Sequence, residues 1–341
     1  MGTHPRSIAL RKAIADARAK IAEAIKAKPD EILFTSCGTE SDNWALLGTV
    51  LRFPNQRKRI ITSSIEHHAI LHTCEFLEKL GYEVIYLPVD RFGLISATNL
   101  KSAINNDTIL VSIMYANNEI GTIEPVWEYS RIAHEQGVLF HTDAVQIIGH
   151  DYVETQTINV DMLSASAHKF NGPKGVGFLY VKRGTPIEPL LHGGGQENGM
   201  RSGTENVASI VGMATALQEH MKSMEADRVF LEELRAQLIA GLHAENLDFI
   251  INGSENHIPG SVSLSFRNVK GEMLLHRLDL MGIAVATGSA CNSKDTVLSH
   301  VIKAIEVPSE YAQGTIRITL GTDNDREQID RIVASLKKIV K

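Results

Sequence analysis

Lys169 stands at the end of a short apolar run, directly after Ser-Ala-His and shortly before a Gly-Pro turn. Met162 and Leu163 favour a strand, and the small residues after them favour a loop from which an amine can project into a cavity. Ser166 and His168 could donate hydrogen bonds to a phosphate near that amine. Taken alone, Lys169 could be one of many solvated surface lysines. Its setting is nevertheless typical of a lysine that binds pyridoxal phosphate (PLP).

Further polar groups follow other apolar runs of the chain. Asp143 could hold a pyridinium N–H and keep the ring an electron sink, and Gln146 could reach the phenolic oxygen of that ring. His67 supplies an imidazole that could stack on the ring. Asn117 and Asn118 offer amides at another strand end. Helix capping explains Asp143 and His67 equally well, and a simple turn explains the two asparagines.

The segment 34–41, Phe-Thr-Ser-Cys-Gly-Thr-Glu-Ser, leads from a predicted strand through a turn of small residues into a helix. Its free amide N–H groups, among them those of Gly38 and Thr39, would point to the strand end. A phosphate fits such a helix N-terminus. The alternative is an ordinary capping sequence in which Thr39 is the N-cap.

The bulk composition limits the classes of function. The chain has 341 residues and a formal charge of −6, from 34 basic and 40 acidic residues. Because no block of like charge stands out, we do not expect a nucleic-acid partner. No apolar run approaches the ~20 residues of a membrane span, and the first residues lack the apolar segment of a signal peptide. We therefore expect a cytoplasmic protein.

The three cysteines, Cys37, Cys74 and Cys291, are too few and too far apart for a disulfide framework or a CxxC site. Cys37 and Cys74 are best explained as small, partly buried apolar residues. Cys291 differs, because its neighbours in Ala-Thr-Gly-Ser-Ala-Cys-Asn-Ser-Lys-Asp are small and polar. A thiol in such a loop is a candidate for chemistry.

Helical stretches alternate with short apolar runs through most of the chain. A helix is predicted over 8–26 and a long or broken one over 206–243. Strands are predicted at 31–35, 59–63, 84–87, 109–114, 138–141, 162–165 and 177–181. This alternation predicts an α/β protein with a mostly parallel seven-stranded sheet, and places ligand groups at the carboxyl ends of the strands. Residues 1–225 would form this large domain, with an N-terminal helix able to pack on the small one. Residues 226–341 would form the small α+β domain, with strands at 261–266, 283–286 and 315–320 and helices near 271–281 and 325–340.

The order of these motifs along the chain resembles that of a known family. The most specific segments are Ala-Asn-Asn-Glu-Ile-Gly at 116–121, His168-Lys169, the glycine-rich stretch 193–206 with its Met-Arg-Ser-Gly-Thr-Glu-Asn end, and Thr-Gly-Ser-Ala-Cys at 287–291. In these the chain resembles cysteine desulfurases of the NifS/IscS type, which are class V aminotransferases with the PLP fold type I. The resemblance covers essentially all residues.

The resemblance implies a role for each matching residue. Lys169 would bind PLP covalently, Asp143 would pair with the ring nitrogen, Gln146 would contact the phenolic oxygen, and His67 would stack on the ring and transfer protons. The phosphate would be held by Gly38, Thr39, Ser166 and His168, with Thr204 reaching across from the second subunit of a homodimer. Asn118, which also lies beside the cofactor, and Arg317 would bind the substrate carboxylate, and Cys291 would be the nucleophile. L-cysteine would then yield L-alanine and a persulfide, passed to an iron–sulfur scaffold or a sulfur-carrier protein.

One segment departs from the family pattern, because members carry an additional N-terminal stretch with an Asp-Asn-x-Ala-Thr-like sequence and this sequence starts at Met-Gly-Thr. We expect this difference to affect activity rather than ancestry. Other functions compatible with the sequence are a selenocysteine lyase, an aminotransferase that needs no exposed Cys291 and consumes a keto acid, and a sulfur-assembly scaffold without turnover. A PLP-binding regulator is disfavoured because no DNA-binding motif is appended.

Overall fold

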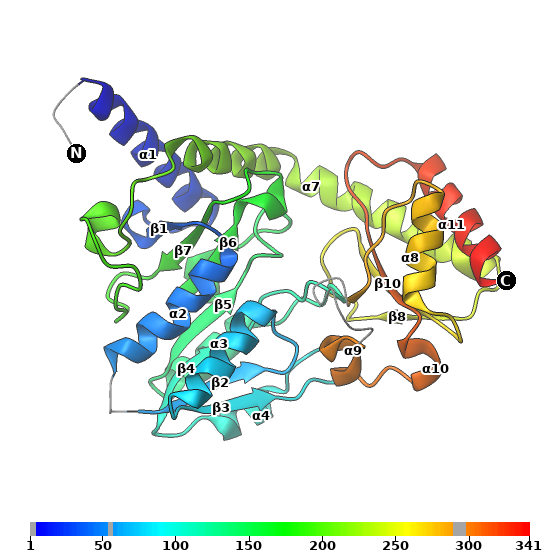
Figure 1. The fold of residues 1–341 in the computed structure, drawn as a ribbon, viewed down its shortest axis with the longest axis horizontal. Coiled ribbons are helices and arrows are strands. Elements are labelled where there is room, and N and C mark those ends of the chain that lie inside the picture. The colour runs from blue at the N-terminus through cyan, green and yellow to red at the C-terminus, as the bar shows by residue number, and fades with distance from the viewer. Residues whose placement is uncertain (1–4, 54–56, 289–297) are drawn as a thin grey trace. The chain divides into compact units, whose positions relative to one another are not determined.

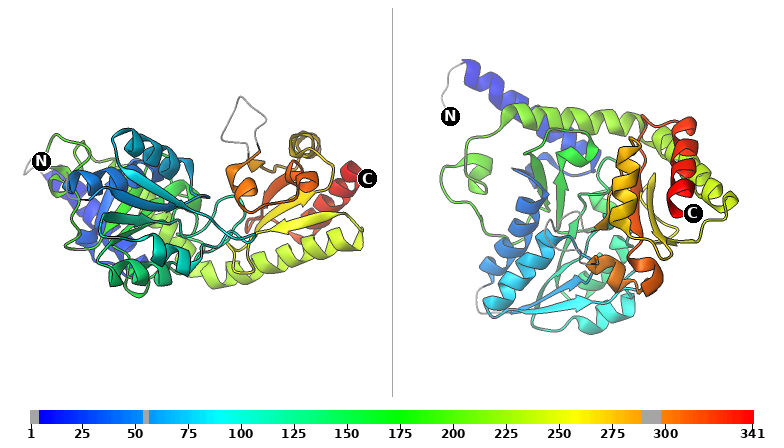
Figure 2. Two further views of the ribbon diagram at one scale, coloured as in Figure 1. Left: turned by 90° about the horizontal axis from the view of Figure 1, so that it is seen from below. Right: turned by 45° about the vertical axis from the view of Figure 1, so that its right-hand side comes forward.

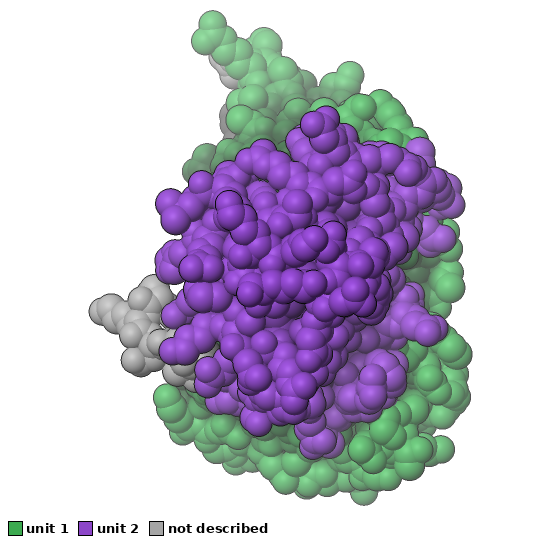
Figure 3. Space-filling model, turned by 90° about the vertical axis from the view of Figure 1, so that its right-hand side faces the viewer, with its two compact units in different colours: residues 1–87, 96–116, 124–224 green, residues 88–95, 117–123, 225–341 purple. Residues whose placement is uncertain are grey.

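The computed structural model describes residues 5–53, 57–288 and 298–341 (Figure 1). The chain divides into two compact units, which Figure 3 distinguishes by colour. Unit 1 contains residues 1–87, 96–116 and 124–224, and unit 2 contains residues 88–95, 117–123 and 225–341. Two short segments, 88–95 and 117–123, thus belong to unit 2 although they interrupt unit 1 in the sequence.

Unit 1 is built on a seven-stranded sheet with the order β1-β7-β6-β5-β4-β2-β3. Strand β7 runs antiparallel to both of its neighbours, and the other described pairs are parallel. The predicted mostly parallel sheet is therefore confirmed. Its strands are β1 (Ile32–Thr35), β2 (Arg59–Ser63), β3 (Glu83–Leu87), β4 (Thr108–Ser112), β5 (Leu139–Asp143), β6 (Met162–Ser166) and β7 (Gly177–Val181).

Helices cover this sheet and bury large apolar side chains against it. Trp44, Phe140 and Phe178 are fully buried. Helix α2 packs on β6 and β7, while α3 packs on α2 and β3. The helices are α1 (Pro5–Ala24), α2 (Gly38–Arg52), α3 (His68–Lys79), α4 (Ala97–Ala103), α5 (Val126–Glu135) and α6 (Thr155–Ile158), with 3₁₀ turns η1 (Pro29–Glu31), η2 (Ala167–Phe170) and η3 (Gln196–Gly199).

Helix α7 (Val207–Ala244) is one continuous helix, visible in both views of Figure 2. Its residues up to 224 belong to unit 1 and those from 225 to unit 2. In unit 2 the buried Leu231, Leu234, Leu238 and Leu242 recur at helical spacing and enter the core. The long helix predicted from Ala, Leu, Glu and Met content is therefore present.

Unit 2 contains an antiparallel three-stranded sheet with the order β10-β9-β8. Its strands are β8 (Phe249–Asn252), β9 (Ser261–Phe266) and β10 (Thr315–Thr319), and its further helices are α8 (Gly271–Leu280), α9 (His300–Ala304), α10 (Ser309–Ala312) and α11 (Arg326–Val340). The strand predicted at 283–286 was wrong, because only Ala286 forms a bridge, to Arg317. Its backbone pairs too briefly for a strand, and β8 takes the outer position beside β9 instead.

Within the described residues, no helix combines the length and apolarity that crossing a membrane requires.

Candidate functional site

Lys169 and Asp143 follow neighbouring parallel strands. Strands β5 and β6 pair in the register Asp143↔Ser164, so their carboxyl ends reach the same edge of the sheet. Asp143 is the last residue of β5, and Lys169 lies in the 3₁₀ turn directly after β6. The positive charge of Lys169 is close enough to lower the pKa of Asp143. The sheet thus brings this predicted pair together.

The Asp143 carboxylate is almost inaccessible, with 6% of the residue exposed. Burial raises its pKa to about 6, although the Val145 N–H and the Lys169 charge act in the opposite direction. The Val145 N–H donates to Asp143 Oδ1 at 2.9 Å, which orients the carboxylate. A buried acid that titrates near neutral pH beside an amine is suited to hold a proton on a bound nitrogen base.

Two further acids are buried near Asp143, and the sequence did not single them out. Burial raises the pKa of Glu66 to about 8, and its Oε1 accepts hydrogen bonds from Ser63 Oγ at 2.6 Å and Met114 N–H at 2.9 Å. The pKa of Asp42 is raised well above its usual value by burial and then by the charge of Asp143. Glu66 is therefore mostly protonated around pH 7, whereas Asp143, with a pKa of about 6, ionises more readily than Glu66.

His141 lies beside the Asp42 carboxyl without adding charge. Its Nε2 lies 3.8 Å from Asp42 Oδ1 and 3.0 Å from Ser164 Oγ, and its Nδ1 lies 2.8 Å from Ser112 Oγ. Burial lowers the pKa of His141 to about 3, so the ring is neutral. Because a neutral imidazole offers no counter-charge, it supports a protonated rather than an ionised Asp42.

The turn before α2 lies against the strand ends of this group. A Cβ added to Gly38 would come within 2.6 Å of Val145 Cγ2, and the next contact would be Ser166 Cβ at 3.5 Å. The backbone at Gly38 can therefore approach this region only because a side chain is missing. The N-cap is Cys37, in extended conformation, so the alternative in which Thr39 is the N-cap is wrong. Thr39 is the second residue of α2 and is exposed.

Ser166 ends β6 and lies close to Gly38, and His168 lies in the 3₁₀ turn η2 that follows. Ser166 is buried, and its Oγ is 2.9 Å from His168 Nδ1. The His168 side chain is exposed. Gly38 and Ser166 are thus neighbours, as a shared phosphate site requires. Thr204 is exposed and has no contact with either residue among those described.

His67 and Gln146 follow β2 and β5 respectively. His67 is the N-cap of α3, and its Nδ1 accepts a hydrogen bond from the Ala69 N–H at 3.1 Å. This contact fixes the tautomer with the proton on Nε2. His67 is therefore a capping residue by its contacts, and its ring remains partly exposed. Gln146 is partly exposed in the turn after Asp143.

Two neighbours fix the main chain of the turn that carries Lys169. His150 Nε2 lies 2.8 Å from the carbonyl oxygen of Lys169. Gly149 has φ +86°, and a Cβ there would approach Phe170 Cβ to 2.5 Å. The turn 149–150 thus packs directly on η2. The sequence did not indicate either of these contacts. The pair Gly149-His150 is the signal that could have suggested them.

Asn118 and Arg317 contact each other inside unit 2. Arg317, on β10, donates through Nη1 to the carbonyl oxygen of Asn118. The Nε of Arg317 is buried and has no hydrogen-bond partner among the described residues. Burial raises the pKa of the nearby Glu119, while the charge of Arg317 lowers it. A buried guanidinium nitrogen without an acceptor is a site for a carboxylate.

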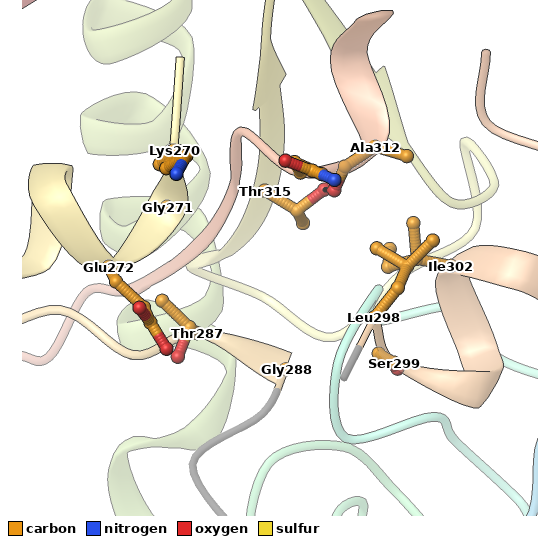
Figure 4. A pocket seen from close by; sticks show the side chains of 11 residues that line it. Lys270, Gly271, Glu272, Thr287, Gly288, Leu298, Ser299, Ile302, Ala312 and Thr315 are labelled. Atoms are coloured by element: carbon orange, nitrogen blue, oxygen red, sulfur yellow. Dashed lines mark hydrogen bonds between the residues drawn. The ribbon is translucent and has the colours of Figure 1, made fainter. Parts of the chain in front are cut away.

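Unit 2 also contains a pocket of about 380 Å³, shown in Figure 4. It is lined by polar and apolar side chains from α8, α9 and the segment before β10. Its lining includes Gly288 and Leu298, the described residues that flank segment 289–297 in the sequence. None of the residues predicted for the site lines this pocket.

The predicted nucleophile Cys291 lies outside the described residues. Of the other two thiols, Cys74 is fully buried, and burial raises its pKa to about 12. Cys37 is partly buried. A thiol with such a high pKa is inert at neutral pH.

The fold and these residues are those of an α/β enzyme with a lysine and a buried aspartate at the strand ends. Residues 1–332 match the family Aminotransferase class-V. The chain is 51% identical over 331 residues to "Cysteine desulfurase IscS" of Dictyoglomus turgidum, covering 97% of this chain and 84% of that protein.

Two solved structures are also similar. A "NIFS-LIKE PROTEIN" has a TM-score of 0.93 and 40% identity, covering 99% of this chain and 90% of its own. "SspA in complex with cysteine" has a TM-score of 0.82 and 35% identity, covering 94% of this chain and 90% of its own. The chain belongs to the cysteine desulfurase family, within the class-V aminotransferases.

Proposed function

We propose that this protein is a PLP-dependent cysteine desulfurase that converts L-cysteine to L-alanine and leaves a persulfide on Cys291. The observation that carries the proposal is the buried Asp143 carboxylate beside Lys169 at the ends of adjacent strands. Relatives named cysteine desulfurase and the cysteine bound to the similar protein SspA support L-cysteine as the substrate.

The residues of unit 1 fit PLP by their chemistry. Because Gly38 has no side chain, the N-terminus of α2 lies close to Val145 and Ser166, and the backbone N–H groups of a helix N-terminus suit a phosphate. Asp143 suits the ring nitrogen, Gln146 the phenolic oxygen, and His67 the ring face. When bound, PLP supplies an electron sink for negative charge at the substrate α-carbon. Asp143 would keep that sink effective by holding the nitrogen protonated.

Lys169 would hold the cofactor and then move a proton. With the substrate bound, the Lys169 Nζ would accept the proton of the substrate α-carbon. The hydrogen bond between His150 and the Lys169 carbonyl fixes the main chain from which that amine acts. His67, with its proton on Nε2, would serve as the second proton carrier.

Arg317 and Asn118 would bind the carboxylate of L-cysteine. The unpartnered Nε of Arg317 supports this role, because a carboxylate would supply the missing acceptor. The contact from Arg317 to the Asn118 carbonyl holds the guanidinium in place. Asn118 would also lie beside the cofactor.

Cys291 would carry out the sulfur transfer as a thiolate. It attacks the sulfur of the substrate, the carbon–sulfur bond breaks, and the bonding electrons stay with the carbon, which is protonated to give alanine. One L-cysteine and one thiol thus become one L-alanine and one persulfide, with no external oxidant or reductant. The persulfide would pass to an iron–sulfur scaffold or a sulfur-carrier protein. A homodimer, in which Thr204 reaches the phosphate of the other subunit, would be the working form.

The test is to add L-cysteine to the purified protein with a reductant and to measure alanine and sulfide together. Equal amounts of both are expected, and a keto-acid requirement or alanine without sulfide would contradict the proposal. L-selenocysteine in a parallel reaction distinguishes a selenocysteine lyase.

The Cys291→Ser variant sharpens this test. It should bind PLP as the parent does but release neither persulfide nor catalytic alanine, whereas the matched Cys37→Ser and Cys74→Ser variants should keep most of the turnover. Release of alanine by Cys291→Ser at the parent rate would remove Cys291 from the mechanism.

A further inference from the structure

The glycine-rich loop after β7 has an irregular backbone that side chains hold in place. Glu197, Asn198, Gly199 and Gly203 all have positive φ. Inside the loop, Ser202 Oγ donates to the Gly194 carbonyl at 2.7 Å, and the Gly203 N–H donates to Gln196 Oε1 at 3.1 Å. Residues with such unfavourable φ angles keep this conformation only where contacts with the surrounding structure hold them in place.

A buried ion pair attaches one end of the loop to the sheet. Arg18 of α1 donates two hydrogen bonds of 2.7 Å to the Glu197 carboxylate, and the Phe34 N–H donates to the same carboxylate at 3.0 Å. Glu197 has only 4% of its side chain exposed. This carboxylate connects the loop to α1 and to β1, at a residue two positions before Ser36.

A second pair attaches the other end of the loop directly to the turn before α2. Arg201 donates from Nε to Glu40 Oε1 at 2.8 Å and from Nη2 to Glu40 Oε2 at 3.0 Å. Glu40 Oε2 also accepts the Ser36 N–H at 2.8 Å. The side chains are only 21% and 13% exposed. One carboxylate therefore connects the start of the turn at Ser36 with the loop residue three positions before Thr204.

The ion pair between Arg201 and Glu40 also compensates a negative charge at the N-terminus of α2. Glu40 lies in the first turn of α2, where a phosphate would bind, and an unpaired carboxylate there would repel it. Burial by itself would raise the pKa of Glu40, but the bonds from Arg201 and Ser36 outweigh burial and hold it below the usual value. Glu40 is thus ionised, and Arg201 supplies its counter-charge.

We propose that Arg201 and Glu40 are positioning residues for the cofactor phosphate: Glu40 fixes the turn 36–39, and Arg201 neutralises Glu40 so that this turn can accept a dianion. This inference rests on the proposed function, because it takes PLP as the ligand. Neither side chain needs to touch the phosphate. The pair acts through the backbone N–H groups that the first turn of a helix leaves without internal partners.

The test is to titrate the apo-protein with PLP and, separately, with pyridoxal, which lacks the phosphate, and to follow absorbance. Arg201→Gln should weaken PLP binding at least tenfold, because it leaves the Glu40 carboxylate unpaired beside the phosphate, and should leave pyridoxal binding within about twofold. Glu40→Gln should weaken PLP binding less, since it removes the repelling charge together with the turn contact. The double variant should bind PLP more tightly than Arg201→Gln alone.

Arg59 and Glu83 offer a matched control. They form the same two-bond pair, at 2.8 and 3.0 Å, between β2 and β3. Arg59→Gln and Glu83→Gln should leave both affinities unchanged.

Equal weakening of PLP and pyridoxal by Arg201→Gln, or no weakening of either, would overturn the inference. If Arg201→Gln fails to fold, the Arg201→Lys variant provides the test. Lysine keeps the positive charge but cannot form both hydrogen bonds to Glu40. This variant should weaken the binding of PLP, by a smaller factor than Arg201→Gln, and leave the binding of pyridoxal unchanged. A parent protein that does not bind PLP at all would instead overturn the proposed function.

Discussion

The two units differ in the ionisable groups that they bury. In unit 1 the acids Asp42, Glu66 and Asp143 are buried together, and the neutral His141 offers them no counter-charge. In unit 2 the contrasting group is Arg317, whose buried Nε has no acceptor among the described residues. Because buried charge without a partner is costly, each arrangement indicates what it should bind. Under the proposed function, Asp143 in unit 1 would bind a protonated nitrogen, and Arg317 in unit 2 would bind a carboxylate.

The largest expected effect follows from removing the buried carboxylate of Asp143 in unit 1. Asp143→Asn keeps the shape of the side chain but cannot stabilise a protonated ring nitrogen, so kcat should fall roughly 10²- to 10³-fold. The measurement is alanine formation under saturating L-cysteine. Asp30→Asn, which changes a largely exposed acid of unit 1, is the control and should retain the parent kcat. A parent-like kcat in Asp143→Asn would mean that the buried acids do not serve a bound base.

The corresponding change in unit 2 should act on substrate binding. Arg317→Lys keeps the charge but loses the planar fork, so kcat/KM for L-cysteine should fall roughly 10- to 100-fold, mostly through KM. Arg267→Lys, at an exposed pair with Asp248, should change neither constant. A fall in kcat with KM unchanged would show that Arg317 does not bind the substrate carboxylate in the ground state.

The raised acid pKa values of unit 1 predict a pH dependence of stability. Glu66 has a pKa of about 8 when folded and an ordinary value near 4.5 when unfolded. Between these values the folded state binds more protons, so its stability falls as pH rises from about 5 to 8. Urea denaturation of the apo-protein should show this fall, and Glu66→Gln should flatten it. Glu83→Gln, an exposed change, should leave the slope intact. An unchanged slope in Glu66→Gln would mean that Glu66 is already ionised.

The smallest effect is expected at Asp42. If this acid is protonated around pH 7, Asp42→Asn replaces one neutral group with another of similar shape. The free energy of unfolding should then change by no more than about 1 kcal/mol. A loss of several kcal/mol, measured by urea denaturation at pH 7, would show that an ionised Asp42 is needed.

The sequence predicted unit 1 well because its strands are short apolar runs between helical stretches. Each predicted strand there is present, and Asp143 and Lys169 could be singled out because polar residues after such runs are easy to see. The prediction was poorer in unit 2, where Phe249–Asn252 is a strand of only four residues and was missed. The run 283–286 has the same apolar character but pairs at one residue only. Segment 249–252 is a strand because it pairs with β9 along its length, whereas segment 283–286 has no such partner strand, and their composition does not show this difference.

The buried acids and the ion pairs of the loop could not be found from the sequence. Asp42 lies within a helix, and whether its side chain faces solvent or the sheet depends on how α2 packs. Arg201 and Glu40 are 161 positions apart. Arg201 and Glu40 lie in segments that stand out in the sequence for their glycines and hydroxyl groups. Neither segment contains a signal that its charged residue pairs with the other segment. Such long-range contacts become visible only when the sheet brings the strand ends together.

The positive φ of Glu197 has a consequence for how this loop can vary among related sequences. At φ +46° a glutamate is strained by roughly 1–2 kcal/mol relative to glycine, and its ion pair with Arg18 must offset that strain. A glycine at this position would remove both the strain and the bond to α1. Arg18 would lose its carboxylate partner and keep its contacts with the Ile32 carbonyl oxygen and the Phe34 ring, so we expect the substitution to be tolerated best together with a change at position 18. The two positions should therefore evolve as a pair.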